Sequence, residues 1–356
     1  MTSVASLFAG IGGIELGFKQ AGAEIIWANE FDKYAAVTYR ENFDHPLIVE
    51  DITKLSEFEM PNADIITAGW PCVAFSVAGN RHGMKYKCLS CTTTHFVEYE
   101  DYILGPTCPS CGASTEPIDP RGTLFYDVIR FIREKQPRAI FLENVKNLRG
   151  HDKGHTFKVI EEMLKASGYY FKSKIMNTMD YGNIPQNRER IYIVGFKSQE
   201  EIDEFEFPEP IPLTRTIHDL LDTKEKQDDK YYYKDNSQYY NMLKEAVKRT
   251  DTVYQLRRVY VRENQSNVCP TLTANMGTGG HNVPIIKDPW GIRKMTPWET
   301  LKFQGYPEEP SFIIPKNMAN SHIYKQVGNS VSVPVVRRIA EKVLGVINSK
   351  KKATIK

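Results

Sequence analysis

Cys72 is the residue of this sequence that is best placed to act as a nucleophile. It follows a short apolar run, Ile65–Ala68, that is typical of a buried strand, and Gly69 and Pro71 end that strand before the cysteine. Ligands bind at the carboxyl ends of the strands in an open α/β sheet. A thiolate at such an edge can attack electrophilic carbon. A buried, apolar cysteine is the alternative interpretation, and other residues of the chain decide between the two.

Four more cysteines form a pattern that is typical of a zinc ribbon. The chain reads C-x2-C, then sixteen residues, then C-x2-C, with a glycine after the second pair. Two such knuckles can supply four thiolates in a tetrahedron, and four cysteines close the coordination shell, so the zinc ion would be structural. Redox-active or iron-bound thiols are the alternatives, and disulfides are disfavoured in a cytosolic chain. The predicted metal ligands are Cys88, Cys91, Cys108 and Cys111.

A glycine-rich turn and two acidic residues indicate a site for an adenosine ligand. The turn, at 9–13, joins a predicted strand to a predicted helix, so its backbone can approach a ligand closely. Glu30 ends the next strand, about 20 residues past the glycines, where an acid can bind ribose hydroxyls. Asp51 follows a third strand and could accept a hydrogen bond from an adenine amino group. Without a phosphate-seeking lysine, S-adenosylmethionine fits better than a nucleotide; a tight structural turn is the alternative.

The hydrophobic pattern predicts an α/β fold that would bring these residues to one edge of a sheet. Short apolar runs bounded by turn residues are typical of buried strands, and segments with helical spacing separate them. The predicted strands are 4–8, 24–29, 46–49, 65–68, 138–142 and 191–196. Four helices are predicted: one begins near Ile14, one ends at Lys135, one spans about 156–166 and one begins near Pro334. The lysine-rich tail from Ser349 is expected to fray.

Glu143 follows the strand at 138–142 and is expected on the same sheet edge as Cys72. A carboxyl group there could cap a helix or form a salt bridge, but beside a cysteine it could also serve as an acid. Arg188 and Arg190 alternate with polar residues in an extended segment. Because side chains two apart on such a segment point the same way, both arginines can converge on one site.

Five short motifs occur in an order that identifies a family. They are Phe8–Gly13, Pro71–Cys72, Glu143–Val145, Gln186–Arg190 and Gly328–Val331. In these motifs the chain resembles the DNA cytosine-5 methyltransferases of bacterial restriction–modification systems. The resemblance covers nearly the whole chain, except an insertion between Gly83 and Arg121 and the segment from about 200 to 265. It implies a Rossmann-like S-adenosylmethionine-dependent methyltransferase fold of class α/β. The large domain would span 1–197 and 320–356, the zinc ribbon 84–118, and a smaller, irregular target-recognition domain 198–319.

The resemblance also implies the reaction. Cys72 would add to C6 of a cytosine that is flipped out of the duplex, and Glu143, as an acid, would hold N3. Arg190, with Arg188 in support, would oppose the developing charge while the methyl group moves from S-adenosylmethionine to C5, leaving S-adenosylhomocysteine. The residues implied to bind the cofactor are Phe8, Gly10, Ile11, Gly12, Gly13, Glu30, Phe31, Asp51, Ile52, Pro71, Leu124, Asn329 and Ser330.

Double-stranded DNA is the expected partner. Basic residues are interleaved with aromatic ones over 231–262, a pattern that suits phosphate and base contacts. Lys85 and Lys87 lead into the insertion, so we expect the zinc ribbon to touch DNA, with a stabilising surface knob as the alternative. The residues expected to contact DNA are Ser76, Arg81, Arg257, Arg258 and Thr271.

The chain departs from the family pattern at two positions. The family usually has Phe-Pro-Cys-Gln, whereas Trp70 stands here for the phenylalanine and Val73 for the glutamine. The glutamine of the family helps to fill the space left by the extruded base. Valine cannot donate or accept hydrogen bonds there, so that role passes to another residue or to the insertion.

Composition excludes few functions. The 46 basic residues nearly balance the 44 acidic ones, so a nucleic-acid surface must come from local clustering. The absence of a signal peptide and of a long apolar stretch predicts a cytoplasmic protein, nucleoid-associated in a prokaryote, that makes no membrane contact. We expect a monomer, with a cognate restriction endonuclease acting separately. The rival functions are a tRNA cytosine-5 methyltransferase and a non-catalytic DNA-binding relative.

Overall fold

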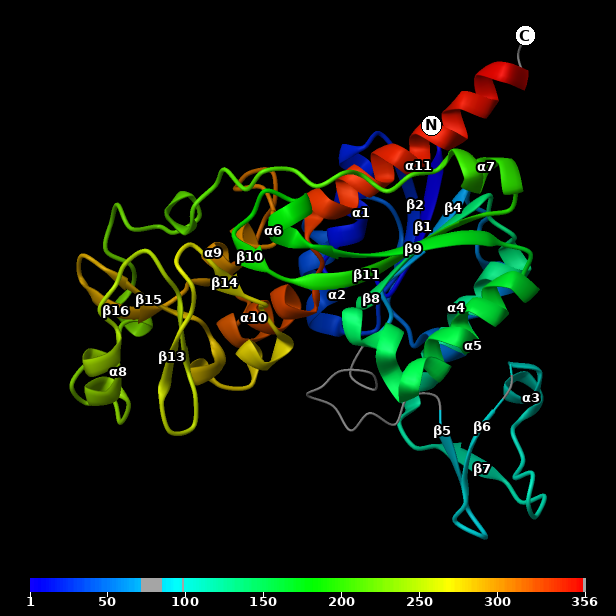
Figure 1. The fold of residues 1–356 in the computed structure, drawn as a ribbon, viewed down its shortest axis with the longest axis horizontal. Helices are drawn as coiled ribbons and strands as arrows, with labels where there is room; N and C mark the ends of the chain where they lie inside the picture. Colours follow the sequence, from blue (N-terminus) through cyan, green and yellow to red (C-terminus); the bar gives the residue numbers. More distant parts are fainter. Residues whose placement is uncertain (72–84, 98, 355–356) are drawn as a thin grey trace.

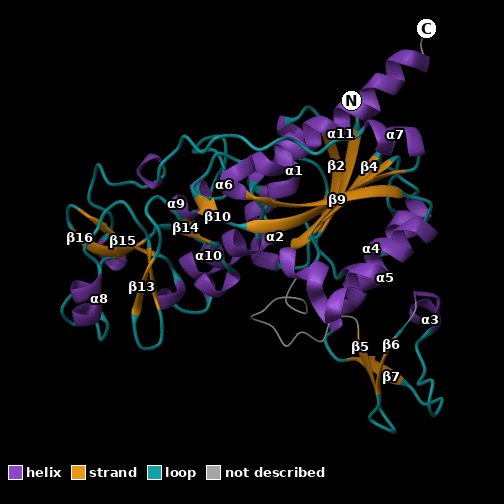
Figure 2. Cartoon of the chain, viewed as in Figure 1, coloured by secondary structure: helices purple, strands orange, loops and turns teal. Residues whose placement is uncertain are grey.

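The computed structural model describes residues 1–71, 85–97 and 99–354. A seven-stranded sheet has the order β3-β2-β1-β4-β8-β11-β9 (Figures 1 and 2). Neighbouring strands are parallel from β3 to β8, whereas β11 runs antiparallel to both β8 and β9. The strands are β1 (Ser3–Leu7), β2 (Glu24–Asn29), β3 (Leu47–Ile48), β4 (Ile65–Ala68), β8 (Ala139–Val145), β9 (Tyr170–Asn177) and β11 (Glu189–Phe196).

Helices cover both faces of this sheet because successive strand residues point to opposite sides. In β8, Ile140 and Leu142 pack against α4 and α5, while Ala139 and Phe141 pack with α1 and α11 on the other face. The central strands β4 and β8 are therefore largely apolar, as expected for a sheet that is buried on both faces. The helices are α1 (Gly13–Gln20), α2 (Lys33–Arg40), α4 (Pro120–Lys135), α5 (His155–Ala166), α6 (Thr178–Tyr181), α7 (Gln199–Glu204) and α11 (Val333–Thr354).

The register of the parallel strands brings three segments to one edge. Leu7 is paired with Ala68, and Ala68 with Leu142, so the residues that follow these three positions begin side by side. They are the start of the glycine-rich turn, Gly69, and Glu143. The sequence predicted that Glu143 lies just past the end of its strand. In the structure it lies inside β8, because the antiparallel pairing with β11 continues from Leu142 as far as Val145.

A second region surrounds an antiparallel sheet in the order β13-β12-β15-β16. Its main core gathers side chains such as Val253, Met276 and Leu301. The same region contains the fully buried Arg293, which pairs with Asp288 and Glu299 at 2.7 Å each. The elements are β12 (Tyr254–Leu256), β13 (Val261–Glu263), β15 (Ile285–Asp288), β16 (Gly291–Lys294), α8 (Tyr240–Ala246) and α9 (Pro297–Lys302).

Two short strands join this region to the large sheet. β10 (Gln186–Asn187) runs directly before β11, and it pairs in parallel with β14 (Cys269–Pro270). α10 (Asn320–Asn329) then leads the chain back to α11, which packs along α1. The motif that contains Arg188 therefore lies where the two regions meet.

The cysteine-rich insertion forms a separate small sheet in the order β6-β5-β7, which hangs from the α4 and α5 side of the large sheet (Figure 1). Its elements are β5 (Lys85–Cys88), β6 (Thr94–Phe96), α3 (Tyr99–Leu104) and β7 (Thr115–Pro117).

The predicted strands and helices of the large sheet are confirmed within a few residues. Two expectations change. The third strand shortens to Leu47–Ile48, and the lysine-rich tail, which was expected to fray, continues α11 as helix to Thr354. Among the described residues, none of the helices is long and apolar enough to cross a membrane.

Candidate active site and metal centre

Glu143 and Arg190 form the charged centre of the sheet edge. The Glu143 side chain is buried, and the Nε atom of Arg190 lies 3.1 Å from its Oε1 atom. Burial raises the pKa of the Glu143 carboxyl above its ordinary value, and the positive charges of Arg190 and Arg188 oppose that rise in part. Because β8 and β11 hold these side chains on paired strands, the pair has a fixed geometry. A buried carboxyl with a raised pKa can keep a proton and act as an acid.

The end of β4 contacts Glu143. A Cβ atom added to Gly69 would lie 3.5 Å from the Oε2 atom of Glu143, so the backbone passes close to the carboxyl group. The side-chain amide of Asn144 donates to the carbonyl oxygen of Trp70 over 3.1 Å and fixes this approach. The backbone at Gly69, three residues before Cys72 in the sequence, therefore lies close to the carboxyl group of Glu143. Cys72, Val73, Ser76 and Arg81 lie outside the described residues.

The sequence predicted that the two arginines can converge on one site; the charges of both act on Glu143, while their hydrogen-bond partners differ. Arg188 is buried and donates to the carbonyl oxygens of Leu272 (2.7 Å), Gly328 (3.3 Å) and Ser330. Its guanidinium group therefore joins three segments that are remote in the sequence. Arg190 pairs with the carboxyl group of Glu143 over 3.1 Å.

The glycine-rich turn and Glu30 form the predicted cofactor site. Phe8, Gly10 and Gly12 all have positive φ angles, of 58°, 58° and 86°, so the turn is tight and left-handed. The amide of Gly10 donates to Glu30 Oε2 over 2.7 Å, and the amide of Asp32 donates to Oε1 over 2.6 Å. These bonds orient the carboxylate, and each oxygen keeps a lone pair for a ligand hydroxyl.

The other predicted cofactor residues differ in how exposed they are and in whether they contact this turn. Phe31 is 69% exposed, so its ring is free to stack on a planar ligand. Asp51 accepts from the amide of Thr53 over 3.0 Å and begins a single helical turn with Ile52. A Cβ atom on Gly13 would lie 2.7 Å from the hydroxyl of Ser330, so the turn and the motif at 328–331 are in direct contact. Leu124 and Pro71 are half-buried, Asn329 is exposed and Ile11 is buried.

These residue types fit S-adenosylmethionine. Carboxylates accept hydrogen bonds from ribose hydroxyls and an adenine amino group, and an exposed aromatic ring can stack on adenine. The bare backbone at Gly12 and Gly13 leaves no room for side chains, since a Cβ atom on Gly12 would lie 2.1 Å from the ring of Phe43. The turn therefore depends on glycine at these two positions.

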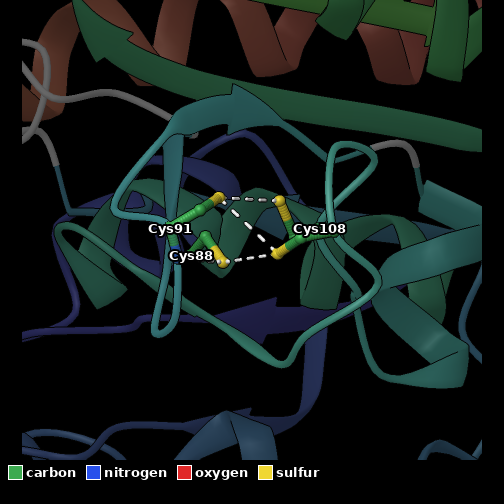
Figure 3. Close-up of side chains that lie close together, drawn as sticks. Cys88, Cys91 and Cys108 are labelled. Carbon is green, nitrogen blue, oxygen red and sulfur yellow. Dashed lines mark hydrogen bonds between the residues drawn. The ribbon is translucent and has the colours of Figure 1, made fainter.

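The four cysteines of the insertion come together as predicted. Their sulfur atoms all lie within 4.8 Å of one another, and Cys88 Sγ lies 3.5 Å from Cys111 Sγ. Sulfur atoms about 3.8 Å apart are expected when four thiolates hold zinc in a tetrahedron at about 2.3 Å. The amides of Ser90 and Cys91 point at Cys88 Sγ over 3.3 Å, which stabilises a thiolate there. Figure 3 shows Cys88, Cys91 and Cys108 pointing toward one another.

The insertion is attached firmly to the helices behind it. The hydroxyl of Tyr126 in α4 donates to the carbonyl oxygen of Val97 over 2.5 Å. The hydroxyl of Tyr102 in α3 donates to Asp127 Oδ2 over 3.0 Å, and Lys85 pairs with Asp152 over 3.5 Å. The cysteine cluster therefore organises a module that packs on the large sheet's own helices.

Sequence reasoning missed the residues that hold the site together. Asn144 was part of a motif, but its bond to Trp70 could not be inferred, and Tyr306, whose hydroxyl lies 2.6 Å from that of Ser330, gave no local signal. Of the predicted DNA contacts, Thr271 donates to the carbonyl oxygen of Asn187 over 2.6 Å. Arg257 and Arg258 are exposed.

Comparisons with known proteins show the family to which the chain belongs. The chain matches the family described as C-5 cytosine-specific DNA methylase over residues 2–103 and 108–345. It is 51% identical over 345 residues to the Type II methyltransferase M.Bsp6I of Bacillus sp. (strain RFL6), covering 96% of this chain and 98% of that protein. It is 34% identical over 358 residues to the Type II methyltransferase M.HhaI of Haemophilus parahaemolyticus, covering 97% and 94% of the two proteins.

Solved structures with the same fold are more distant in sequence. The Dnmt2 methyltransferase of S. pombe superposes with a TM-score of 0.69 at 19% identity, covering 98% of this chain and 100% of that one. The methyltransferase EhMeth of Entamoeba histolytica superposes with a TM-score of 0.66 at 19% identity, covering 98% and 99%. These two structures support the α/β methyltransferase fold.

Proposed function

We propose that Cys72, Glu143 and Arg190 are the catalytic residues of this chain, which belongs to the family of C-5 cytosine-specific DNA methylases. It is a DNA cytosine-5 methyltransferase that uses S-adenosylmethionine. The observation that supports the residue assignment is the buried pair of Glu143 and Arg190 beside Gly69, three residues before Cys72. In this assignment Cys72 is the nucleophile that acts with a carboxyl group of raised pKa and its fixed cation.

The reaction balances with these groups. The thiolate of Cys72 adds to C6 of cytosine, and the electrons displaced from the C5–C6 bond are taken up at N3, which receives the proton of Glu143. C5 becomes nucleophilic, and S-adenosylmethionine, when bound, supplies the methyl group as an electrophile. Loss of the C5 proton then expels Cys72 as a thiolate and restores the double bond, and N3 returns its proton to Glu143. Such an attack needs a base that is flipped out of the duplex.

Arg190 and Arg188 have separate roles in this proposal. Arg190 opposes the negative charge that develops on the ring and holds Glu143 in place. Arg188 is a positioning residue, because its donors are directed to the carbonyl oxygens of Leu272, Gly328 and Ser330. Glu30, Asp51 and Phe31 would hold the adenosine part of the methyl donor, around the turn at Gly10.

Trapping with 5-fluorocytosine tests the assignment. Fluorine at C5 cannot leave as a proton, so the Cys72 adduct should accumulate on a duplex of mixed sequence in the presence of S-adenosylmethionine. We expect a stable protein–DNA adduct that maps to Cys72 and is absent from Cys72→Ala. Cys269→Ala is the matched control, since that thiol is fully buried and burial raises its pKa. An adduct on another side chain, or none with active wild-type protein, contradicts the assignment.

The biological setting is part of the same proposal. Relatives named Type II methyltransferases support a role in restriction–modification, with a separate endonuclease, in the cytoplasm and near the nucleoid. We expect a monomer, because one active site treats one strand of a target per visit. Transfer of labelled methyl groups to DNA but not to tRNA separates this function from that of a tRNA methyltransferase.

The zinc ion is proposed as a structural metal. Residues 84–118 contain two lysines and four acidic residues, and four thiolates with one Zn²⁺ add two further negative charges. A module with this charge repels phosphate, so support for α4 through Tyr126 and Asp127 is the favoured role, in place of the DNA contact expected from the sequence. The proposed domains are 1–197 with 320–356, 198–319, and this insertion at 84–118.

A further inference from the structure

A β-hairpin projects from the second region and is anchored on only one face. β12 and β13 pair antiparallel, with Leu256 opposite Val261, and the amide of Arg257 donates to the carbonyl oxygen of Tyr260 over 2.8 Å to close the turn. Tyr254, Leu256 and Val261 belong to a small core with Leu243 of α8. This core fixes the position of the hairpin, whose strand β13 forms one edge of the four-stranded sheet, away from the large sheet (Figure 1).

The opposite face and the tip carry polar and exposed groups. Gln255 lies directly across from Arg262, and Arg257 Nη2 donates to Gln255 Oε1 over 3.1 Å. These three side chains therefore share one face of the ribbon. At the tip, Val259 is 81% exposed and Tyr260 is 54% exposed.

The hairpin has a positive charge that the described part of the chain does not neutralise. Arg257, Arg258 and Arg262 form no ion pair with any described acidic residue. The nearby Arg249 differs, since it pairs with Asp251 over 2.6 Å and with Glu263 over 3.3 Å. Glu263, the acid on the hairpin, is thus already bound. This charge is complementary to DNA.

We propose that this hairpin enters the major groove of the DNA target and that Arg257 determines the sequence that is methylated. This inference rests on the proposed function. The major groove admits a two-stranded β-ribbon, and guanine offers O6 and N7 acceptors there that match the two donors of an arginine. Gln255 orients the guanidinium group of Arg257, so the arginine is held ready for one base. Arg258 and Arg262 flank it and contact phosphates, which adds affinity without sequence preference.

Site preference measured on a randomised duplex library tests the inference. The wild-type protein and the variants Arg257→Ala, Gln255→Ala, Arg258→Ala and Arg249→Ala are incubated with the library, and methylated cytosines are read by bisulfite sequencing. Arg257→Ala should lose discrimination at one base pair by about tenfold to a hundredfold. Gln255→Ala should relax the same position by less. Arg258→Ala should weaken methylation of all sites alike and lower the salt dependence of binding.

Arg249→Ala is the charge-matched control and should keep the wild-type preference, because its partners lie within the protein. Unfolding temperature and binding of S-adenosylmethionine show whether each variant is folded. A wild-type site preference in folded Arg257→Ala overturns the inference and would leave the exposed tip to a protein partner. If the wild-type protein itself methylates no cytosine in DNA, the proposed function has failed instead.

Discussion

Arg190 Nε lies 3.1 Å from Glu143 Oε1, and this contact joins an acid on β8 to a cation on the neighbouring antiparallel strand. The two residues have opposite effects on one proton. Burial favours the protonated carboxyl of Glu143, while the charge of Arg190 favours the carboxylate. The pair therefore sets the pH up to which Glu143 can donate its proton to cytosine N3.

Replacing Arg190 should change the pH profile as well as the rate. In Arg190→Gln the opposing charge is lost, so the pKa of Glu143 rises further. Activity that needs protonated Glu143 is lost as pH rises through this pKa, so the descending limb of kcat/KM should move to higher pH. The loss of charge stabilisation should lower kcat by about 100-fold to 1,000-fold. Rates measured from pH 5 to 10 check both effects.

Glu143→Gln is the companion variant, because it keeps the shape of the side chain and removes the titration. Its descending limb should vanish, and turnover should fall by about 100-fold to 10,000-fold. If the limb persists in this variant, another group causes it and the role of Glu143 as the acid is wrong.

Glu15 should make stability depend on pH, although it takes no part in the proposed chemistry. It is fully buried in the first turn of α1, and burial raises its pKa from 4.5 to about 7. The unfolded chain releases this proton at lower pH than the folded protein, so stability falls as pH rises from about 4.5 to about 7 and the slope then ends. The total loss is about 3 kcal/mol.

Glu15→Gln removes this group and should give a free energy of unfolding that varies less between pH 5 and pH 8. Urea unfolding at these two pH values measures the difference. Glu24, an exposed acid at the start of β2, gives the control variant Glu24→Gln, which should keep the wild-type dependence on pH. An equal pH dependence in Glu15→Gln and the wild-type protein would show that the buried carboxyl is not the cause.

The sequence alone predicted those elements that are marked by residues close together in the chain. Short apolar runs bounded by glycine and proline located β1, β2 and β4, and the spacing of four cysteines located the metal cluster. Glu143 was predicted at the sheet edge where β4 ends, and the parallel pairing of β4 with β8 brings it beside Gly69; the predicted place of Cys72 lies outside the described residues. These features depend on residues that are close in the sequence or on a general rule of sheet topology.

The partners of buried polar groups could not be predicted, because they come from distant segments. The sequence predicted that Arg188 and Arg190 can converge on one site, but alternation gives the direction of a side chain and not its hydrogen-bond partners. The acceptors of Arg188 are carbonyl oxygens 84 and 142 residues away, at Leu272 and Ser330. The ion pair of Lys85 with Asp152 is another example, because Asp152 lies in a later segment of the chain.

Removal of the metal should loosen the insertion and then α4. Cys108→Ser replaces a buried ligand, so the protein should lose its single equivalent of zinc and unfold at lower temperature, because metal binding is coupled to folding. Ser110→Ala, within the same knuckle, keeps all four thiols and should retain zinc. Metal analysis and thermal unfolding measure the two effects. Full zinc content and stability in Cys108→Ser would contradict a four-cysteine site.

The salt dependence of DNA binding separates the two roles of the insertion. If the module only supports α4, Lys87→Ala should bind DNA with the same slope against salt as the wild-type protein, since Lys87 contacts no phosphate. A slope that is smaller by about one unit would instead place this lysine on DNA, as the sequence first suggested.

Arg293 should be the residue of the second region that is most sensitive to substitution by an apolar residue. Its guanidinium group is fully buried, with Asp288 on one side and both oxygens of Glu299 on the other. Arg293→Met removes this buried cation and leaves two carboxylates buried without it, which should cost about 3 to 5 kcal/mol of unfolding free energy. Urea unfolding of Arg293→Met checks the value.

The matched control is Arg262→Met, because Arg262 is an exposed arginine of β13. This variant should change the free energy of unfolding by less than about 0.5 kcal/mol. Equal effects in the two variants would mean that the buried charges are not needed to hold this region together.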